Sequence, residues 1–406
     1  MSKYGETARV DDKAYCLFES SDTVCLYTAF SATFVDTLPL LRETLRSFAA
    51  EFDLEYVLAE NKQVAKALED LTRLHTLKLQ GVEPGVHEIR PEETLHALQH
   101  ISITSDFGPV SALDLVPRCP NLTTLSYDST HPCTHFSYPN KAPWPPLREL
   151  HLGSDTHVLL PKMQPAPRIV SVHRLTINAS TLSAAFLPAP SHYLTALLRS
   201  TRPAALLVAG AYTNDAKLSG DPAWAPVLRA EGTRLRSLEL AATTLSAIEP
   251  AVLVSAFVGL PLVYLGWTQT GHAHPGRDCL PLEPARVRTA HTLSTLLVDA
   301  LPALCVLKVG CMFSASVVED AEDGELRERL SLAGDEAPAR GELQEFRGVQ
   351  RGVRWWIVKR GGDGRKMVEV WREVGERAKE VVESDGFDPE SSALDEFFVP
   401  RNVYQL

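Results

Sequence analysis

The chain has 406 residues, of which 45% are hydrophobic and 22% charged, and its formal net charge at pH 7 is −11. This composition is that of a folded globular protein and excludes a largely disordered one. The negative charge also argues against an overall field that attracts nucleic acid or anionic lipid, so we expect neither nucleic acid nor a membrane among the partners.

The cysteines and the N-terminal segment bear on the cellular compartment. Seven cysteines are scattered along the chain and form no C-x-x-C pair, which is typical of reduced thiols. Residues 1–15 are polar and lack the apolar core of a secretory signal. The longest apolar run, residues 251–267, is interrupted by Gly259 and Pro261 and favours a buried helix and a strand over a membrane span. We therefore expect an intracellular protein, in the cytoplasm or the nucleus.

Residues 1–70 are predicted to form an N-terminal segment and a helical cap. Leu41, Leu45 and Phe48 make one apolar face, and apolar residues between 54 and 71 make another at helical spacing. Two helices at this point would cover the first repeat of the region that follows, whose core edge would otherwise face water.

From residue 71 the sequence repeats an apolar spacing of three positions and then two, beginning at Leu74, Leu77 and Leu79. The middle residues of successive sets lie 24 or 25 positions apart, at Leu77, Ile101, Leu125, Leu150 and Leu175. A fixed period in the twenties with an L-x-x-L-x-L core is typical of a leucine-rich-repeat solenoid.

Later repeats are longer, with intervals of 31, 32, 27 and 42 residues that lead to Leu206, Leu238, Leu265 and Leu307. The extra residues form inserts at 183–200, 211–229 and 271–289, and a helix is predicted from Thr289 to Leu301. We therefore expect an α/β fold, a horseshoe of about nine irregular repeats over residues 71–318 with a parallel sheet on its concave side.

The C-terminal part changes in character. Residues 319–345 are rich in acidic side chains and are expected to form a solvated linker. Two runs of strand-forming residues, 353–359 and 366–371, flank a Gly/Asp turn and predict a β-hairpin, and a helix should follow from Glu373 to about Glu383. We expect residues 346–390 to be the C-terminal cap and residues 391–406 to be a tail.

Side chains alternate along a strand, so residues between the buried leucines should face outwards on the concave sheet. The outward set is polar and mixed in charge in the first repeats, and smaller and more apolar in the later ones. Such a strip suits a protein partner, and a basic strip of the kind that binds nucleic acid is missing from it. The residues that we expect to bind this partner are His100, Asp128, Glu149, His151, Arg174, Asn178, Glu239 and Tyr264.

Two triplets could supply metal ligands: His131 with Cys133 and His135, and His272 with His274 and Cys279. Neither has a partner pair at the spacing of a zinc finger or ribbon, so we expect no metal and no other cofactor. The glycine-rich segment 360–366 lies between two predicted strands and is a turn rather than a phosphate-binding loop. No catalytic motif is found, which favours a non-enzymatic protein; the alternative is a hydrolase with a site in the insert loops.

The repeats PPLRELHLGSD, TRLRSLELAATTL and LPALCVLKVG, followed by the VRWWIVKR hairpin and an amphipathic helix, resemble the leucine-rich-repeat region of fungal F-box proteins. This is the ribonuclease-inhibitor-like class, and the resemblance covers residues 70–385. It implies a non-catalytic substrate receptor of a cullin-type ubiquitin ligase, in which the F-box binds the ligase adaptor and the repeats bind the target.

Thr37–Leu41 (TLPLL) is the only segment similar to the start of an F-box, so the chain has no recognisable F-box and we assign no residue to adaptor binding. The alternative is a leucine-rich-repeat scaffold or regulator, for example of a GTPase or an assembly, that is unrelated to ubiquitin.

Overall fold

The chain folds into two compact units in the computed structural model. The first contains residues 1–178 and 192–201, and the second contains residues 179–191 and 202–406. The boundary between the two units lies inside residues 71–318, for which the sequence predicts one continuous series of repeats. The structure describes residues 8–10, 14–20, 23–26, 44–50, 71–80, 95–105, 111–129, 143–153, 169, 171–178, 191–213, 225–244, 250–271, 283–312, 353–361, 364–389 and 391–398.

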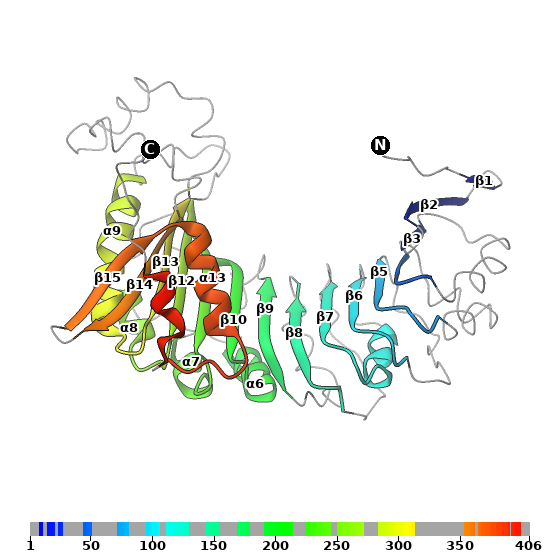
Figure 1. Ribbon diagram of the computed structural model, residues 1–406, viewed down its shortest axis with the longest axis horizontal. Helices are drawn as coiled ribbons and strands as arrows, with labels where there is room; N and C mark the ends of the chain where they lie inside the picture. The colour runs from blue at the N-terminus through cyan, green and yellow to red at the C-terminus, as the bar shows by residue number, and fades with distance from the viewer. Residues whose placement is uncertain are drawn as a thin grey trace, which may run out of the picture. The chain divides into compact units, whose positions relative to one another are not determined.

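In the first unit, each strand is hydrogen-bonded to the next strand in the sequence (Figure 1). The strands are β1 (Ala8–Val10), β2 (Ala14–Ser20), β3 (Thr23–Leu26), β4 (Ser47–Ala50), β5 (Thr76–Gln80), β6 (His100–Ser105), β7 (Thr124–Ser129), β8 (Leu147–Leu152) and β9 (Val172–Asn178). The helices are the 3-10 helix η2 (Ser111–Arg118) and α6 (Ser191–Thr201). Strands β1 to β3 pair antiparallel, and β3 to β9 pair parallel.

The register of β5 to β9 is the one that the repeat spacing predicts. Leu77 pairs with Ile101, Ile101 with Leu125, Leu125 with Leu150, and Leu150 with Leu175. All five are buried, and so are the flanking apolar residues of each repeat. The inward side chains therefore stack in three rows that run across the sheet: Leu74, Leu98, Leu122, Leu147 and Val172; Leu77, Ile101, Leu125, Leu150 and Leu175; and Leu79, Ile103, Tyr127, Leu152 and Ile177.

The helix predicted around Leu41 to Phe48 is wrong in the part that the structure describes. Residues 47–50 form strand β4, in which Phe48 pairs with Leu77 of β5. Leu45 and Phe48 are fully buried and carry the spacing of a repeat, three positions apart. Backbone N–H groups of His75 and Thr76 donate to the carbonyl of Arg46. Pairing with β5 therefore satisfies the backbone hydrogen-bonding groups of this segment in a strand conformation. Residues 1–7 and 51–70 of the expected cap lie outside the described residues.

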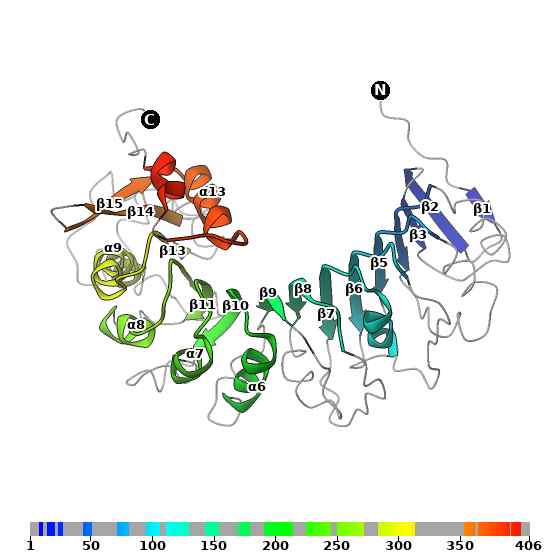
Figure 2. The same cartoon turned by 60° about the horizontal axis from the view of Figure 1, so that its bottom comes forward.

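The second unit is also α/β, and its sheet is parallel from β10 to β13 and antiparallel from β13 to β15. Its strands are β10 (Ala205–Thr213), β11 (Ser237–Thr244), β12 (Tyr264–Gly271), β13 (Val306–Met312), β14 (Val353–Gly361) and β15 (Gly364–Val370). Its helices are α7 (Ala225–Glu231), α8 (Pro250–Phe257), α9 (Glu283–Ala300), α13 (Arg372–Glu383) and the 3-10 helix η5 (Ser392–Phe397). Helices α7, α8 and α9 cover one face of this sheet, and α13 lies on the other (Figure 2).

The predicted C-terminal hairpin and helix are confirmed. Strand β14 pairs with β15 up to Gly361 and Gly364, and Gly364 has a φ of 115°, in the region that favours glycine. Strand β14 also pairs with β13, with Trp356 opposite Leu307, so the hairpin continues the sheet of the last repeat. The packed core extends past the expected end of the cap at residue 390, because Phe397 of η5 is buried in it. The acidic segment 319–345 lies outside the described residues.

Arg365 fastens the hairpin to α9. Its guanidinium donates to the carbonyl oxygens of Val298, Leu301 and Leu304, with an Nη1–O distance of 2.8 Å to Leu301. These carbonyls lie at and just beyond the C-terminal end of α9, where the helix leaves its acceptors unpaired and carries partial negative charge. Among the described residues, none of the helices has the length and apolar character that a membrane span requires.

Replacing Leu125 with alanine should lower the free energy of unfolding by about 2–5 kcal/mol, because the side chain is fully buried between Ile101 and Leu150 of the adjacent strands. Chemical denaturation followed by circular dichroism measures this loss. The matched control is Leu296→Ala on α9, whose side chain is 42% exposed and should matter by less than about 0.5 kcal/mol. Equal losses from the two variants would contradict the stacking of the buried rows.

Replacing Arg365 with alanine should destabilise the second unit by about 2 kcal/mol, since three carbonyls at the end of α9 lose a charged donor. Arg365→Lys should recover only part of this loss, because an ammonium group does not present the guanidinium fork. Urea denaturation followed by tryptophan fluorescence tests both variants. The neighbouring Lys366 is exposed, and Lys366→Ala should be neutral; a neutral Arg365→Ala would refute the role of this contact.

Candidate partner-binding face

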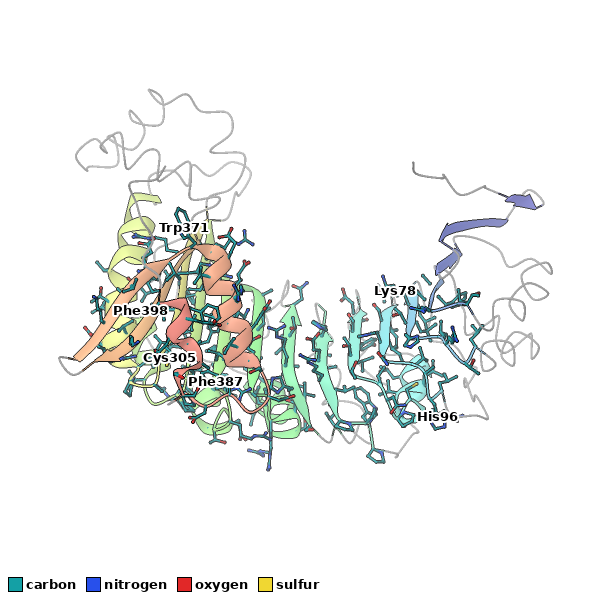
Figure 3. The ribbon with its side chains drawn as sticks, in the orientation of Figure 1. Lys78, His96, Cys305, Trp371, Phe387 and Phe398 are labelled. Carbon is teal, nitrogen blue, oxygen red and sulfur yellow. The ribbon has the colours of Figure 1, made fainter. Side chains whose placement is uncertain are left out.

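The outward side chains of β4 to β9 form one continuous surface, which we call the polar strand face. The alternation is as predicted: Leu77 and Leu79 are buried, whereas Lys78 between them is exposed. Paired strands place equivalent residues side by side. The first row is Ser47, Thr76, His100, Thr124, Glu149 and Arg174, and the second row is Ala49, Lys78, Ser102, Ser126, His151 and Thr176. Figure 3 shows these side chains, with Lys78 on β5 and His96 away from it in the turn before β6.

Six of the eight residues predicted to bind a partner lie on the polar strand face. His100 and Asn178 are exposed, and the other four are half-buried. The six are His100, Asp128, Glu149, His151, Arg174 and Asn178. They come from β6, β7, β8 and β9, so neighbouring strands bring together residues up to 78 positions apart.

Glu149 links the charged residues of β8 and β9. Its carboxylate lies 3.3 Å from Nε2 of His151 and 3.8 Å from Nη1 of Arg174. These side chains are about one-third exposed, and an ion pair in such a position contributes only about 0–1 kcal/mol to stability. Glu149 and Arg174 therefore have little influence on folding. Each could leave this weak ion pair and pair with a charged residue of a partner instead.

Asp128 owes its position to a glycine on the next strand. A Cβ atom at Gly153 would lie 1.8 Å from Oδ1 of Asp128, so the carboxylate occupies the space that any side chain at position 153 would need. The backbone N–H of Gly153 donates to the carbonyl of Tyr127 at 2.7 Å, which holds the glycine beside β7. Residue 153, directly after β8, must therefore be glycine for Asp128 to keep this position.

Tyr264 is not available to a partner, contrary to the expectation from the sequence. Its exposed fraction is 0%, because its ring packs against Trp355 with the centroids 6.0 Å apart and the ammonium of Lys379 lies 5.1 Å from its centroid. Its hydroxyl donates to Oε2 of Glu239 at 3.2 Å. The residue faces outwards on β12, as the register predicts, but the C-terminal segment covers it.

Glu239, also predicted to bind a partner, is instead the centre of an internal ion-pair network. Lys308 of β13 donates to Oε1 at 2.5 Å, and Lys379 of α13 donates to Oε2. Burial opposes ionisation of this carboxyl, but the Lys379 and Lys308 ammonium groups outweigh burial and lower its pKa to about 2. The side chain is only 12% exposed, so it holds α13 on the sheet rather than meeting a partner.

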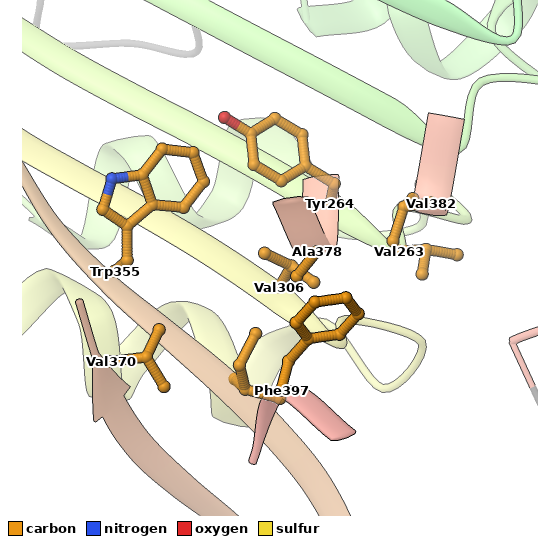
Figure 4. Close-up of a cluster of buried hydrophobic side chains, with 9 residues drawn as sticks. Val263, Tyr264, Val306, Trp355, Val370, Ala378, Val382 and Phe397 are labelled. Carbon is orange, nitrogen blue, oxygen red and sulfur yellow. The ribbon is translucent and has the colours of Figure 1, made fainter. Parts of the chain in front are cut away.

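Helix α13 packs on apolar residues of β12, β13 and β14, and its polar contacts reach β11 (Figure 4). Its Ala378 and Val382 are buried together with Tyr264, Val306 and Trp355. At its C-terminal end polar contacts continue the docking: the Ser237 hydroxyl donates to Oε1 of Glu383 at 2.7 Å, and Arg236 donates to the carbonyl of Ser384. A strand face of this chain thus holds an amphipathic helix through an apolar centre and charged ends.

The sequence did not indicate two groups of functional residues. Ser47 and Ala49 of β4 extend the polar strand face, and the spacing of Leu45 and Phe48 was the signal that could have revealed them. Lys379 and Glu383 of α13 bind the face of β11, and the apolar residues Ala378 and Val382 on one side of that helix were their signal.

The described residues contain no cluster of metal ligands, and one buried thiol has a raised pKa. No group of three or more His, Cys, Asp or Glu side chains is placed there to hold a metal ion. Both histidine–cysteine triplets lie outside the described residues. Cys119 and Cys305 are not joined in disulfide bonds, and burial raises the pKa of the Cys119 thiol to about 12, although Arg118 opposes this shift.

A comparison of the chain with models of protein families and with curated protein sequences finds no match.

Replacing Glu239 with glutamine should lower the free energy of unfolding of the second unit at pH 7 by about 3 kcal/mol, the equivalent of a pKa that falls from 4.5 unfolded to about 2 folded. A depressed carboxyl pKa stabilises the fold above pH 4.5, and this contribution is lost as the pH falls to about 2. The variant should therefore show a flatter stability profile between these pH values in urea titrations.

The matched control for this experiment is Glu376→Gln, on the same helix. Glu376 pairs with Arg372 at the exposed surface, so its loss should change stability by less than about 0.5 kcal/mol. If Glu239→Gln were as mild as the control, α13 would not depend on the ion pairs of Glu239.

Proposed function

We propose that this protein is a leucine-rich-repeat solenoid whose polar strand face binds a protein partner without catalysis. The regular register of β4 to β9 supports the repeat assignment, because each set of leucines falls on the set of the next strand. In such a solenoid the strands line the concave side, and each repeat is stabilised by its neighbours. The fold itself then presents a broad surface to other molecules.

The observation that carries the proposal is the character of the polar strand face. Apart from Ala49, its two paired rows hold serine, threonine, histidine and charged side chains, while every inward row is apolar. Asp128 over Gly153 and the Glu149–Arg174 pair give it a defined pattern of charge. Mixed charge on a surface several strands wide is suited to selecting a protein surface by complementary charges.

The ligase assignment is the more specific part of the proposal. The repeats around Leu150, Leu238 and Leu307, with the following hairpin and helix, resemble those of fungal F-box proteins. We therefore propose that the partner on the polar strand face is a substrate for ubiquitination and that a cullin-ligase adaptor is a second partner.

Two single variants, Glu149→Lys and Arg174→Glu, each reverse one charge of the Glu149–Arg174 pair. Each variant should weaken partner binding at least about tenfold, because it places two like charges together. Thermal unfolding should change little, since both side chains are about one-third exposed. Quantitative co-precipitation from cells measures the binding, and circular dichroism measures the stability. Intact binding in both single variants would contradict this role of the face, as would loss of folding equal to loss of binding.

The ligase role is tested by co-precipitation of the cullin adaptor with the full chain, beside a known F-box protein as the positive control. Recovery of the adaptor with both proteins is the expected result. Recovery with the control alone would reject the ligase role and favour a scaffold or regulator unrelated to ubiquitin.

A further inference from the structure

We propose that the partner presents an acidic helix to the polar strand face and that this helix makes polar contacts with the strands like those that α13 makes with β11. The inference rests on the proposed function, because it names the kind of surface that the same face selects. Three observations carry it: the way α13 is seated, the charge of the polar strand face, and the size of its side chains.

Helix α13 shows how an outward strand face of this chain holds a helix. Lys379 contacts Glu239, while Glu383, four residues further along the helix, contacts Ser237, two residues earlier on β11. From Lys379 to Glu383 the helix therefore advances towards the N-terminal end of β11, and its Gly375 lies against Trp355 of β14, where an added Cβ would be 2.4 Å from the indole ring. Arg236, one residue before Ser237, donates to the carbonyl of Ser384 at the end of the helix, where partial negative charge gathers.

The polar strand face lacks the carboxylate that holds α13. Lys379 of α13 contacts Glu239 in the second outward row of the second unit, beside Lys308, whereas the equivalent row of the first unit holds Lys78 and His151 and no carboxylate. The position of Arg236 before the first row is occupied by Arg148 on β8 and by Arg46 directly before β4. A helix seated like α13 would thus meet basic groups both at its centre and at its C-terminal end.

The charge of the whole face points the same way. In a chain of net charge −11, the outward and edge positions of β4 to β9 hold more basic than acidic residues. The basic residues are Arg46, Lys78, Arg148 and Arg174, the acidic ones are Asp128 and Glu149, and the histidines are His75, His100, His151 and His173. The complement of this surface is a partner whose carboxylates face Lys78 and Arg148.

The side chains of the second row are small enough for a helix to approach. Between Lys78 and His151 it presents Ser102 and Ser126, and at its ends Ala49 and Thr176. The corresponding row beneath α13 holds larger residues, and the close approach there comes from Gly375 of the helix, where an added Cβ would lie 2.4 Å from Trp355. The small residues of the polar strand face leave room for a helix that carries larger side chains.

Two stapled peptides test the inference with the full-length protein. Both peptides have the sequence of residues 371–385, including Ala378 and Val382. In the acidic peptide the three basic residues are replaced with glutamate. In the basic peptide the five acidic residues are replaced with lysine. Fluorescence anisotropy should show at least about tenfold tighter binding of the acidic peptide, and this binding should weaken as salt is raised. A single-stranded oligonucleotide serves as a third probe.

Variants locate the site in the first unit. Lys78→Glu combined with Arg148→Glu should weaken the acidic peptide at least about tenfold, because both side chains are exposed on or beside the face. Arg372→Glu, exposed on α13 in the second unit, is the matched control and should leave binding unchanged. Equal weakening by the control would overturn the assignment to the polar strand face.

Tighter binding of the basic peptide or of the oligonucleotide would overturn the acidic helix, as would the failure of both peptides to bind. The proposed function is judged separately by the Glu149→Lys and Arg174→Glu variants. If these still weaken capture of the cellular partner while both peptides fail, the face binds a protein of different chemistry. If the reversals leave capture intact, the proposed function fails together with the inference.

Discussion

The in-register pairing of parallel strands is the constraint on which the first unit depends. Because Leu77, Ile101, Leu125, Leu150 and Leu175 lie opposite one another, their side chains share one buried row, and residues of the adjacent strands flank each of them. A slip of one residue in any strand would turn its leucines outwards and its polar residues inwards. The same pairing therefore determines which residues are buried and which are presented to solvent.

Outward residues differ between the two units, and the difference explains how each face is used. On β12 and β13 the first outward row contains Tyr264 and Val306, which are too apolar to face water and are buried beneath α13. On β6 and β7 the same row contains His100 and Thr124, which tolerate water. Glu239 completes the contrast, since its ion pairs with Lys308 and Lys379 hold α13 where a partner could otherwise bind.

The sequence predicted the register, the hairpin and α13 because each has a local period or turn. It misled around Leu45 and Phe48, since a separation of three residues fits a helix as well as a repeat, and only pairing with β5 decides between them. Burial of Tyr264 and Glu239 could not be predicted, because Trp355 and Lys379, which cover them, lie more than 90 residues further along the chain. The contacts of Arg365 at the end of α9 are also long-range, since they span 61 to 67 residues.

The central claim is that the polar strand face binds a protein, and site-specific photo-crosslinking in cells tests it most directly. A photoreactive residue at Ser102, in the middle of the second row, is compared with one at Val258, which is exposed at the end of α8. We expect a single partner to be crosslinked from position 102 and not from position 258. Equal crosslinking of that partner from both positions, or crosslinking from position 258 alone, would contradict the account.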